Sequence, residues 1–422
     1  MKLRYIAFCL LATVFGCEGE QAGGSYVAGD TAVVSFEDPI RGTAELREVL
    51  RIGDVTGDPE YLLARVSMFT VGHDGSVFVA QSDGDLRRYD RNGAYLGAVA
   101  RPGQGPGEVQ HVIGMDVDSL GRLAVFDLGN QRVSIYSPDM AFERQIRRPS
   151  MGVAYGRDAL QWDSNGNLWM AIHPRRSGQG TVGSSPRPIY GQLGASGTVV
   201  DTVFLPTRAW EGCSRRRAEF AVGFWEDSRL PYLPFAQWTF HPPSTLVFGC
   251  AAEYSFDVET PSGVRRIVRD WDAPVITDEE RDFHTWVQDR PGKSMPGYSV
   301  PRERPAFLRI WRAGDGRYWL WRGAIGRSTE YTAEEREAVS RLIPGRAPLR
   351  SWRYYSPTDG FDVFDADGSW LGHVPTPPNW DADPHPGLRD PFFRGDTVWA
   401  VTNDELGVKY ISKFVVDWHP SN

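Results

Sequence analysis

The sequence predicts an all-β fold made of repeated units, each with four short strands. The 422 residues include 45 glycines and 30 prolines, so turns are frequent, and 12% of the residues are aromatic. Such a composition favours strands over helices. Gly75, Gly121 and Gly166 each lie in a turn between two short apolar runs, and they are 46 and 45 residues apart. A regular spacing of about 45 residues is typical of propeller blades.

Six such units are expected between residues 42 and 418, with a short tail at 419–422. They cover residues 65–100, 101–137, 159–205, 237–269, 306–374 and 390–417. The last unit has only three strands. The segment Glu45–Glu60 is similar to Tyr95–Glu108, which forms a fourth strand and the loop after it. We therefore expect a six-bladed β-propeller of four-stranded antiparallel blades, closed by the N-terminal strand in the last blade, since closure removes an open sheet edge.

The N-terminal residues are typical of an exported protein. Two basic residues precede the apolar run Ile6–Phe15, which is too short to span a bilayer and predicts a signal peptide. Residues 14–17, Val-Phe-Gly-Cys, resemble the cleavage site of a bacterial lipoprotein. We expect a signal peptide over residues 1–16, lipid on Cys17, and a flexible tether over residues 17–41. The predicted location is the cell envelope, on its periplasmic side or at the cell surface. An ordinary signal peptide without lipid is the alternative.

Two further cysteines would reach an oxidising compartment with the exported chain. They are Cys213 and Cys250, and we expect a disulfide between them. Two separate buried thiols are the alternative. The formal net charge is −8, which argues against nucleic acid as a partner. No other apolar run approaches the length of a membrane span, so contact with a membrane is expected through the lipid.

Long insertions occur in only one class of connection. In a four-stranded blade, the turns joining strands one to two and three to four lie on one face, and all other connections lie on the opposite face. The first class contains only short turns, and we call its side the short-turn face. The second class forms the elaborated face, with insertions at 173–188, 206–236, 270–304 and 322–350, the last including an expected helix at 332–342. The insertions contain three more basic than acidic residues, whereas the whole chain has an excess of acidic residues.

The insertions carry the residues that we predict to bind a partner. They are Trp210, Arg215, Arg216, Arg217, Trp225 and Trp286. Loops on a rigid scaffold often carry function, and Trp and Arg dominate binding hot spots. Arginine pairs with carboxylate or phosphate, and tryptophan stacks on sugars or apolar side chains. The alternatives are that the aromatic residues form a satellite core and that the arginines lie in a solvated loop.

No local motif predicts a catalytic or metal site. The loop Gly103–Glu108 is rich in glycine but lacks the Lys and Ser/Thr of a phosphate-binding loop, so we interpret it as a crossover turn. Asp127 and Arg132 flank a connection, where we expect a local side-chain turn and an ion pair between blades. None of the eight histidines has the spacing of a metal motif. No nucleophile motif is present either.

Three segments resemble bacterial six-bladed β-propeller lipoproteins related to NHL-repeat proteins. They are Gly103–Glu108, Val125–Val133 and Ile135–Tyr136. The resemblance is strong over residues 45–170 and weak over residues 206–360. It implies the propeller fold and the cell-envelope location, and it implies no particular activity.

These observations favour a cell-envelope binding protein without a cofactor, whose elaborated face engages a peptide, a glycan or an envelope protein. The alternative is a propeller-type metal-dependent hydrolase or lyase, similar to lactonases or streptogramin lyases, with a divalent metal at the mouth of the channel. The binding protein is preferred because the sequence contains no metal or nucleophile motif.

Overall fold

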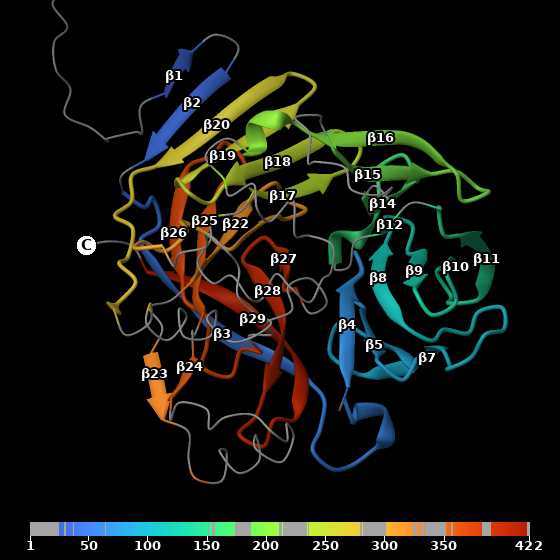
Figure 1. Ribbon diagram of the computed structural model, residues 1–422. Helices are drawn as coiled ribbons and strands as arrows, with labels where there is room; N and C mark the ends of the chain where they lie inside the picture. The colour runs from blue at the N-terminus through green and yellow to red at the C-terminus, as the bar shows by residue number, and fades with distance from the viewer. Residues whose placement is uncertain are drawn as a thin grey trace, which may run out of the picture.

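The computed structural model consists of β-sheets that follow one another in chain order around a common centre (Figure 1). It describes residues 25–28, 31–36, 38–63, 65–150, 152–153, 157–173, 187–210, 213, 234, 236–278, 281, 301–323, 327–330, 333, 352–355, 358–381 and 390–419. Within this part, the 3-10 helices are η1 (Pro59–Tyr61), η2 (Arg157–Ala159) and η3 (Thr207–Trp210). No helix in the described ranges is long and apolar enough to cross a membrane.

Four consecutive antiparallel strands form the basic unit of the larger sheets. The first two sheets consist of β4 (Val66–Val71), β5 (Val77–Gln81), β6 (Leu86–Tyr89) and β7 (Tyr95–Ala100), and of β8 (Val112–Val117), β9 (Leu123–Asp127), β10 (Arg132–Tyr136) and β11 (Phe142–Arg147). The third contains β13 (Leu160–Trp162), β14 (Leu168–His173), β15 (Arg187–Leu193) and β16 (Val199–Leu205), with β12 (Gly152–Val153) also paired to β14. The fourth contains β17 (Ala236–His241), β18 (Thr245–Cys250), β19 (Ser255–Thr260) and β20 (Gly263–Arg269).

The remaining strands form an eight-stranded sheet and a small hairpin. One half of the large sheet is β21 (Arg309–Arg312), β22 (Tyr318–Gly323), β25 (Thr358–Phe364) and β26 (Trp370–Val374). The other half is β27 (Phe392–Arg394), β28 (Thr397–Asn403), β29 (Lys409–His419) and β3 (Thr43–Ile52). A single parallel pair joins β26 to β3, so the large sheet is two four-stranded groups. The hairpin consists of β23 (Arg327–Glu330) and β24 (Trp352–Tyr355).

The short turns are built by an aspartate and a glycine. In the turn between β8 and β9, the Asp118 carboxylate accepts hydrogen bonds from the backbone N–H groups of Leu120 (3.0 Å) and Arg122 (2.8 Å). Gly121 in this turn has a φ of +86°, which favours glycine because it has no Cβ. Asp90 and Asp163 accept equivalent bonds in their own turns. The repeated glycines of the sequence therefore mark a repeated turn geometry.

Hydrophobic side chains fill the space between successive sheets. Neighbouring residues of a strand point to opposite faces, and on β9 they enter different clusters. Val125 packs with Phe78 of the first sheet, whereas Phe126 packs with Met170 of the third. Antiparallel four-stranded sheets packed face to face in sequence make this fold a β-propeller.

The N-terminal strand pairs with the last strand of the chain. β3 lies antiparallel to β29, with pairs from Ile411↔Ile52 to His419↔Thr43. The loop after β3 also matches the loop after β7, as the sequence similarity predicts. The Tyr89 hydroxyl donates to the Glu60 carbonyl (2.5 Å), and the Tyr136 hydroxyl donates to the Gly107 carbonyl (3.2 Å). Both tyrosines lie on the third strand of their sheets, so the two loops are held in the same way.

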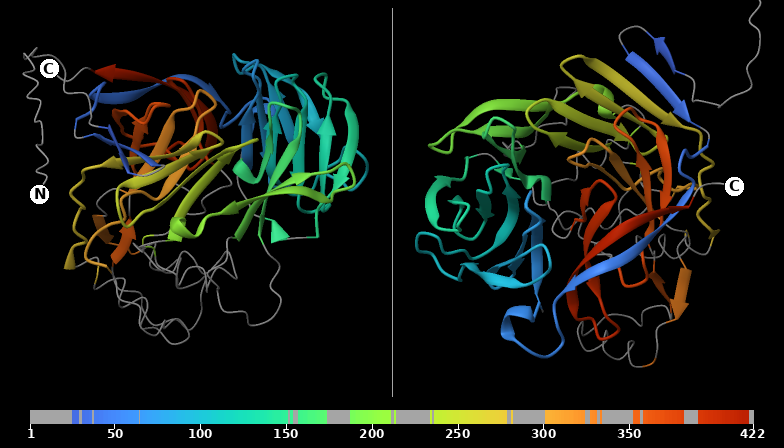
Figure 2. Two further views of the ribbon diagram at one scale, coloured as in Figure 1. Left: turned by 90° about the horizontal axis from the view of Figure 1, so that it is seen from above. Right: turned by 180° about the vertical axis from the view of Figure 1, so that it is seen from behind.

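The segment expected as a flexible tether is partly ordered in strands. β1 (Ser25–Ala28) and β2 (Thr31–Phe36) form a hairpin, and β2 pairs in parallel with the outer edge of β20. Figure 2 shows this hairpin beside β20. Val33 is buried, and Val34 packs on the cluster between β18–β20 and β21–β26. Residues 25–28 and 31–36 of the segment expected as a tether therefore form strands, because the apolar residues of β2 cover an edge strand that would otherwise be open.

Several expectations lie outside the described residues. They include the signal peptide, Cys17 and, apart from Ala333, the helix at 332–342.

Candidate functional site

The predicted binding residues fall mainly outside the described part of the chain. Arg215, Arg216, Arg217, Trp225 and Trp286 are among the residues that the structure leaves undescribed. Trp210 is described as the last residue of η3, without its side chain. The structure does describe the residues at which the insertions leave the scaffold, and these residues define the candidate site.

A disulfide joins the insertion at 206–236 to the scaffold. The Sγ atoms of Cys213 and Cys250 are 2.13 Å apart, and their Cα atoms are 5.5 Å apart. Cys250 ends β18, and Cys213 lies shortly after η3. The bond therefore fixes the insertion to the second strand of its blade at the point where that strand reaches the elaborated face.

Arg208 of η3 fixes the same insertion by ion pairs. Its guanidinium lies 2.5 Å from the Glu259 carboxylate and 3.5 Å from the Asp257 carboxylate, both on β19. It also lies over the Phe248 ring, 5.0 Å from the centroid. The Asp257 side chain is almost fully buried and also accepts a 2.7 Å bond from Arg266. The first residues of the insertion are thus held to a buried carboxylate.

A second buried carboxylate, Asp362 on β25, occupies the equivalent position in the next blade. Its side chain has no exposed surface. It pairs with Arg269 at 2.5 Å and Arg322 at 3.4 Å, and the Tyr254 hydroxyl donates to it. His373 Nδ1 lies 2.9 Å from the Asp362 Oδ1 atom, which also pairs with Arg322, whereas Arg269 and Tyr254 contact Oδ2. The Arg269 guanidinium also lies over the Trp370 ring, 3.7 Å from the centroid. We call Asp362 and these four polar partners the Asp362 cluster.

The Asp362 cluster holds the starts of two insertions. Arg269 is the last residue of β20, from which the insertion at 270–304 leaves. Arg322 is next to the end of β22, where the insertion at 322–350 begins. Both guanidinium groups meet on one carboxylate that water does not reach. The arrangement can therefore position loops on two neighbouring blades relative to each other.

The charge state of the Asp362 cluster follows from its surroundings. Burial acts to raise the pKa of Asp362, but the hydrogen bond with His373 and the charges of Arg322 and Arg269 outweigh it, so the pKa is lowered. Burial and the negative charge of Asp362 raise the pKa of Tyr254 well above its ordinary value. At neutral pH the tyrosine therefore keeps the proton that it donates to the carboxylate.

Sequence reasoning overlooked both buried aspartates, although a signal was present. Each lies in the tripeptide Phe-Asp-Val, at residues 256–258 and 361–363. A charged residue inside an apolar run on the third strand of two consecutive blades indicates a buried, paired carboxylate. The partners come from other strands at long sequence distances, so the tripeptide predicts the burial but not the cluster.

The interpretation of Asp127 and Arg132 needs one correction. Asp127 accepts hydrogen bonds from the backbone N–H groups of Gln110 and His111 and from Asn130, as a side-chain turn requires. Arg132 donates instead to the backbone carbonyls of Gly105 (2.5 Å) and Glu108 (2.9 Å). Among the residues that the structure describes, neither Asp127 nor Arg132 forms an ion pair, so the expected ion pair is wrong. The backbone carbonyls of the glycine-rich loop accept these hydrogen bonds from the Arg132 guanidinium.

Among the described residues, no group of three or more His, Cys, Asp or Glu side chains is arranged to hold a metal ion.

Solved structures align with most of the chain at low sequence identity. No protein-family model and no curated protein matches the chain. A member of the DUF4221 family from Bacteroides vulgatus aligns with a TM-score of 0.50 at 10% identity, over 90% of this chain and 100% of that one. A candidate exported protein from Bacteroides fragilis gives 0.48 at 10% identity, over 92% and 99%. Virginiamycin B lyase from Staphylococcus aureus gives 0.40 at 12% identity, over 88% and 99%. At such identities the similarity concerns the fold alone.

Proposed function

We propose that the protein is an exported, lipid-anchored scaffold of the bacterial cell envelope, related to NHL-repeat lipoproteins. Its elaborated face binds a peptide, a glycan or an envelope protein. The observation that carries this proposal is the fixing of the insertions on neighbouring blades. Arg208, Arg269 and Arg322 all hold insertion starts to buried carboxylates. A loop that is held before binding loses less conformational entropy on binding.

The scaffold in this proposal is a closed ring of six blades. Its support is that, on the second strand of each unit, two adjacent residues enter different hydrophobic clusters. The pairs are Phe78 and Val79, Val125 and Phe126, Trp169 and Met170, Val247 and Phe248, Trp319 and Leu320, and Val398 and Trp399. Val79 of the first unit shares a cluster with Trp399 of the last. Each unit therefore has two packed neighbours, as a closed ring requires.

The binding face is tested by paired double substitutions. We expect Trp210→Ala with Arg216→Ala to weaken binding of the envelope partner by about 2–4 kcal/mol, because truncation of Trp and Arg hot spots typically has effects of this size. Pull-down from solubilised cell envelope measures the loss. The matched control is Asn92→Ala with Asn165→Ala in turns of the short-turn face. Equal losses of binding from the two double substitutions would show that the elaborated face is not the binding face.

Lipid anchoring is tested separately. Cys17→Ser removes the thiol that would carry the lipid, so we expect the variant to take up no labelled fatty acid and to remain unprocessed or to become soluble. Metabolic labelling and membrane fractionation report the outcome. Uptake of label by the variant would exclude Cys17 as the lipidated residue, while binding by the elaborated face would stand unaffected.

A further inference from the structure

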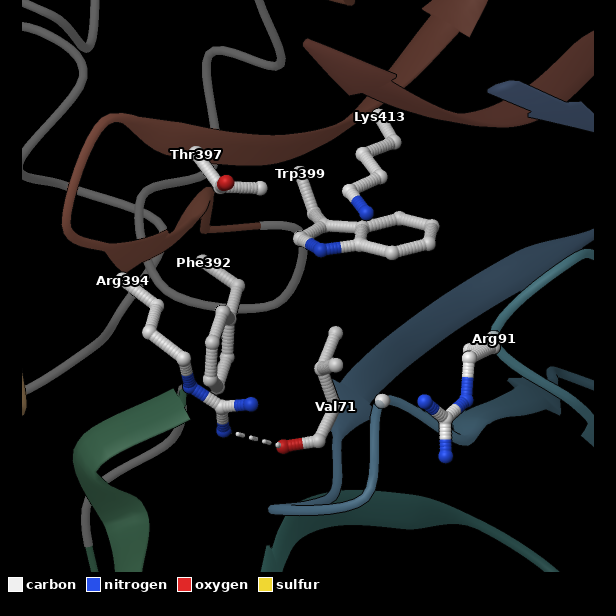
Figure 3. Close-up of a pocket in the computed structure, with 8 residues that line it drawn as sticks. Val71, Arg91, Phe392, Arg394, Thr397, Trp399 and Lys413 are labelled. Atoms are coloured by element: carbon white, nitrogen blue, oxygen red, sulfur yellow. Dashed lines mark hydrogen bonds between the residues drawn. The ribbon is translucent and has the colours of Figure 1, made fainter. Parts of the chain in front are cut away.

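A small pocket lies on the short-turn face, where the first sheet meets the β27–β28–β29 strands (Figure 3). Its volume is about 110 Å³. The polar and aromatic residues that line it are Arg91, Phe392, Arg394, Thr397, Trp399 and Lys413. We call it the seam pocket. It lies on the opposite face from the strand ends where the insertions begin, so its role is independent of the partner proposed above.

The lining of the seam pocket is positively charged. Three of its residues are cationic and none is acidic, although the whole chain carries a net charge of −8. Lys413 is half-buried on β29, and its Nζ lies 5.5 Å from the centroid of the Trp399 ring. Within the described part of the chain, neither Lys413 nor Arg91 forms an ion pair. Aromatic contact therefore holds Lys413 in place without neutralising its charge.

Arg394 contributes a third charge and is held by neutral groups. It donates to the backbone carbonyls of Gly72 (3.0 Å) and Val71 (3.4 Å), and it lies 5.0 Å from the centroid of Phe392. Figure 3 shows its guanidinium beside Phe392 and the bond to Val71. Burial lowers the pKa of Arg394, and the more distant carboxylates of Asp74 and Asp116 only partly oppose this.

The two carboxylates near Arg394 have other partners. Asp74 accepts hydrogen bonds from Ser76 and pairs with Arg88 at 3.4 Å. Asp116 accepts the backbone N–H of Trp162 at 2.7 Å. Neither lines the pocket. The pocket is therefore lined by three cationic residues and by no carboxylate, which favours the binding of an anion.

We propose that the seam pocket binds a small organic anion, with a carboxylate or phosphate group carried on an apolar group. Lys413 and Arg91 supply charge to the oxyanion, and the Thr397 hydroxyl is available as a donor. Val71, Phe392 and Trp399 provide the apolar part of the wall. The volume admits a group of a few atoms, so the pocket is suited to the end of a ligand rather than to a large molecule.

Titration of the full chain with simple probes tests this site. The probes are benzoate, phenyl phosphate and the neutral benzamide, followed by ligand-observed NMR at pH 7.5 and low salt. We expect both anions to bind at least about tenfold more tightly than benzamide, which is the effect of one charge-assisted contact. The tighter of the two anions identifies the carboxylate or the phosphate as the natural group. Added salt should weaken the binding of both.

A charge-matched pair of variants places the binding in the pocket. Lys413→Gln should weaken anion binding about tenfold or more, whereas Arg144→Gln, which removes the same charge from an exposed position on β11, should leave it unchanged. Thermal unfolding verifies that each variant is folded. If Lys413→Gln unfolds, Arg91→Gln in the exposed turn replaces it in the same comparison. Equal binding of benzamide and benzoate, or equal effects of the pocket and control variants, would overturn the proposal.

Discussion

Replacement of Asp362 by asparagine is expected to lower the free energy of unfolding by about 3–5 kcal/mol, the range measured when one partner of a buried ion pair is removed. The substitution keeps the shape of the side chain but removes the negative charge that pairs with the Arg269 and Arg322 guanidinium groups. The side chain of Arg269 is only 12% exposed, so hydration of its guanidinium can hardly replace the lost ion pair. Urea-induced unfolding, followed by fluorescence, measures the change.

The matched control for this prediction is Asp257→Asn. Asp257 occupies the same Phe-Asp-Val tripeptide in the preceding blade, but its arginine partners, Arg208 and Arg266, are 37% and 45% exposed at their side chains. Water can solvate these two guanidinium groups once the carboxylate is gone, so we expect a smaller loss of stability. A loss from Asp362→Asn no greater than that from Asp257→Asn would contradict the assigned role of the Asp362 cluster.

The pH dependence of stability gives an independent readout for Asp362. Its pKa is lower in the folded protein than in the unfolded chain. An aspartate with a depressed folded pKa stabilises above its unfolded pKa of about 3.9, and this contribution disappears as the pH falls towards the folded value. The wild-type protein should therefore lose stability below about pH 4 more steeply than Asp362→Asn. Parallel curves for the two proteins would show that Asp362 does not change its pKa on folding.

Deletion of the chain through Ile52 is expected to abolish cooperative unfolding and to cause aggregation. The deletion removes β3, which pairs with β29 over its whole length. It also removes Ile52, which is buried between the first sheet and β28–β29. Both the β29 edge and part of the interface with the first sheet become exposed, and an exposed edge invites pairing with other chains. Thermal unfolding and size-exclusion chromatography report the result.

A shorter truncation provides the control. Starting the chain at Asp38 removes β1 and β2, which cover the edge of β20 but lie outside the four strands of that sheet. This variant should still unfold cooperatively, with a lower midpoint because Val33 and Val34 no longer cover the sheet. If deletion through Ile52 were as mild as the shorter deletion, β3 would not be needed to complete its sheet.

The repeated turns and apolar runs were sufficient to predict the sheets. An aspartate that caps a turn, as Asp118 does, acts on residues two to four positions away, so its geometry follows from local sequence. The pairing of β3 with β29 was also predictable. It follows from the similarity of Glu45–Glu60 to Tyr95–Glu108 together with a three-stranded last unit.

The candidate site was only partly predictable. The sequence placed Cys213 and Cys250 in one blade and suggested their bond, because only two cysteines remained to pair. It did not suggest that Arg208 would fix the same insertion. That arginine lies about fifty positions from Asp257 and Glu259, and nothing local distinguishes it from the other arginines of the insertion.

The sequence by itself determined the strand content, the repeat and the class of connection that carries the insertions. These features depend on side-chain periodicity and turn chemistry, which act over a few residues. Only the tertiary structure decided which charges meet. Asp362 gathers Arg269, Arg322, Tyr254 and His373 from four other strands or loops, and the seam pocket joins Arg91 to Lys413 across the first and last units. Such contacts arise when packing brings distant segments together and excludes water. A local sequence pattern therefore cannot predict them.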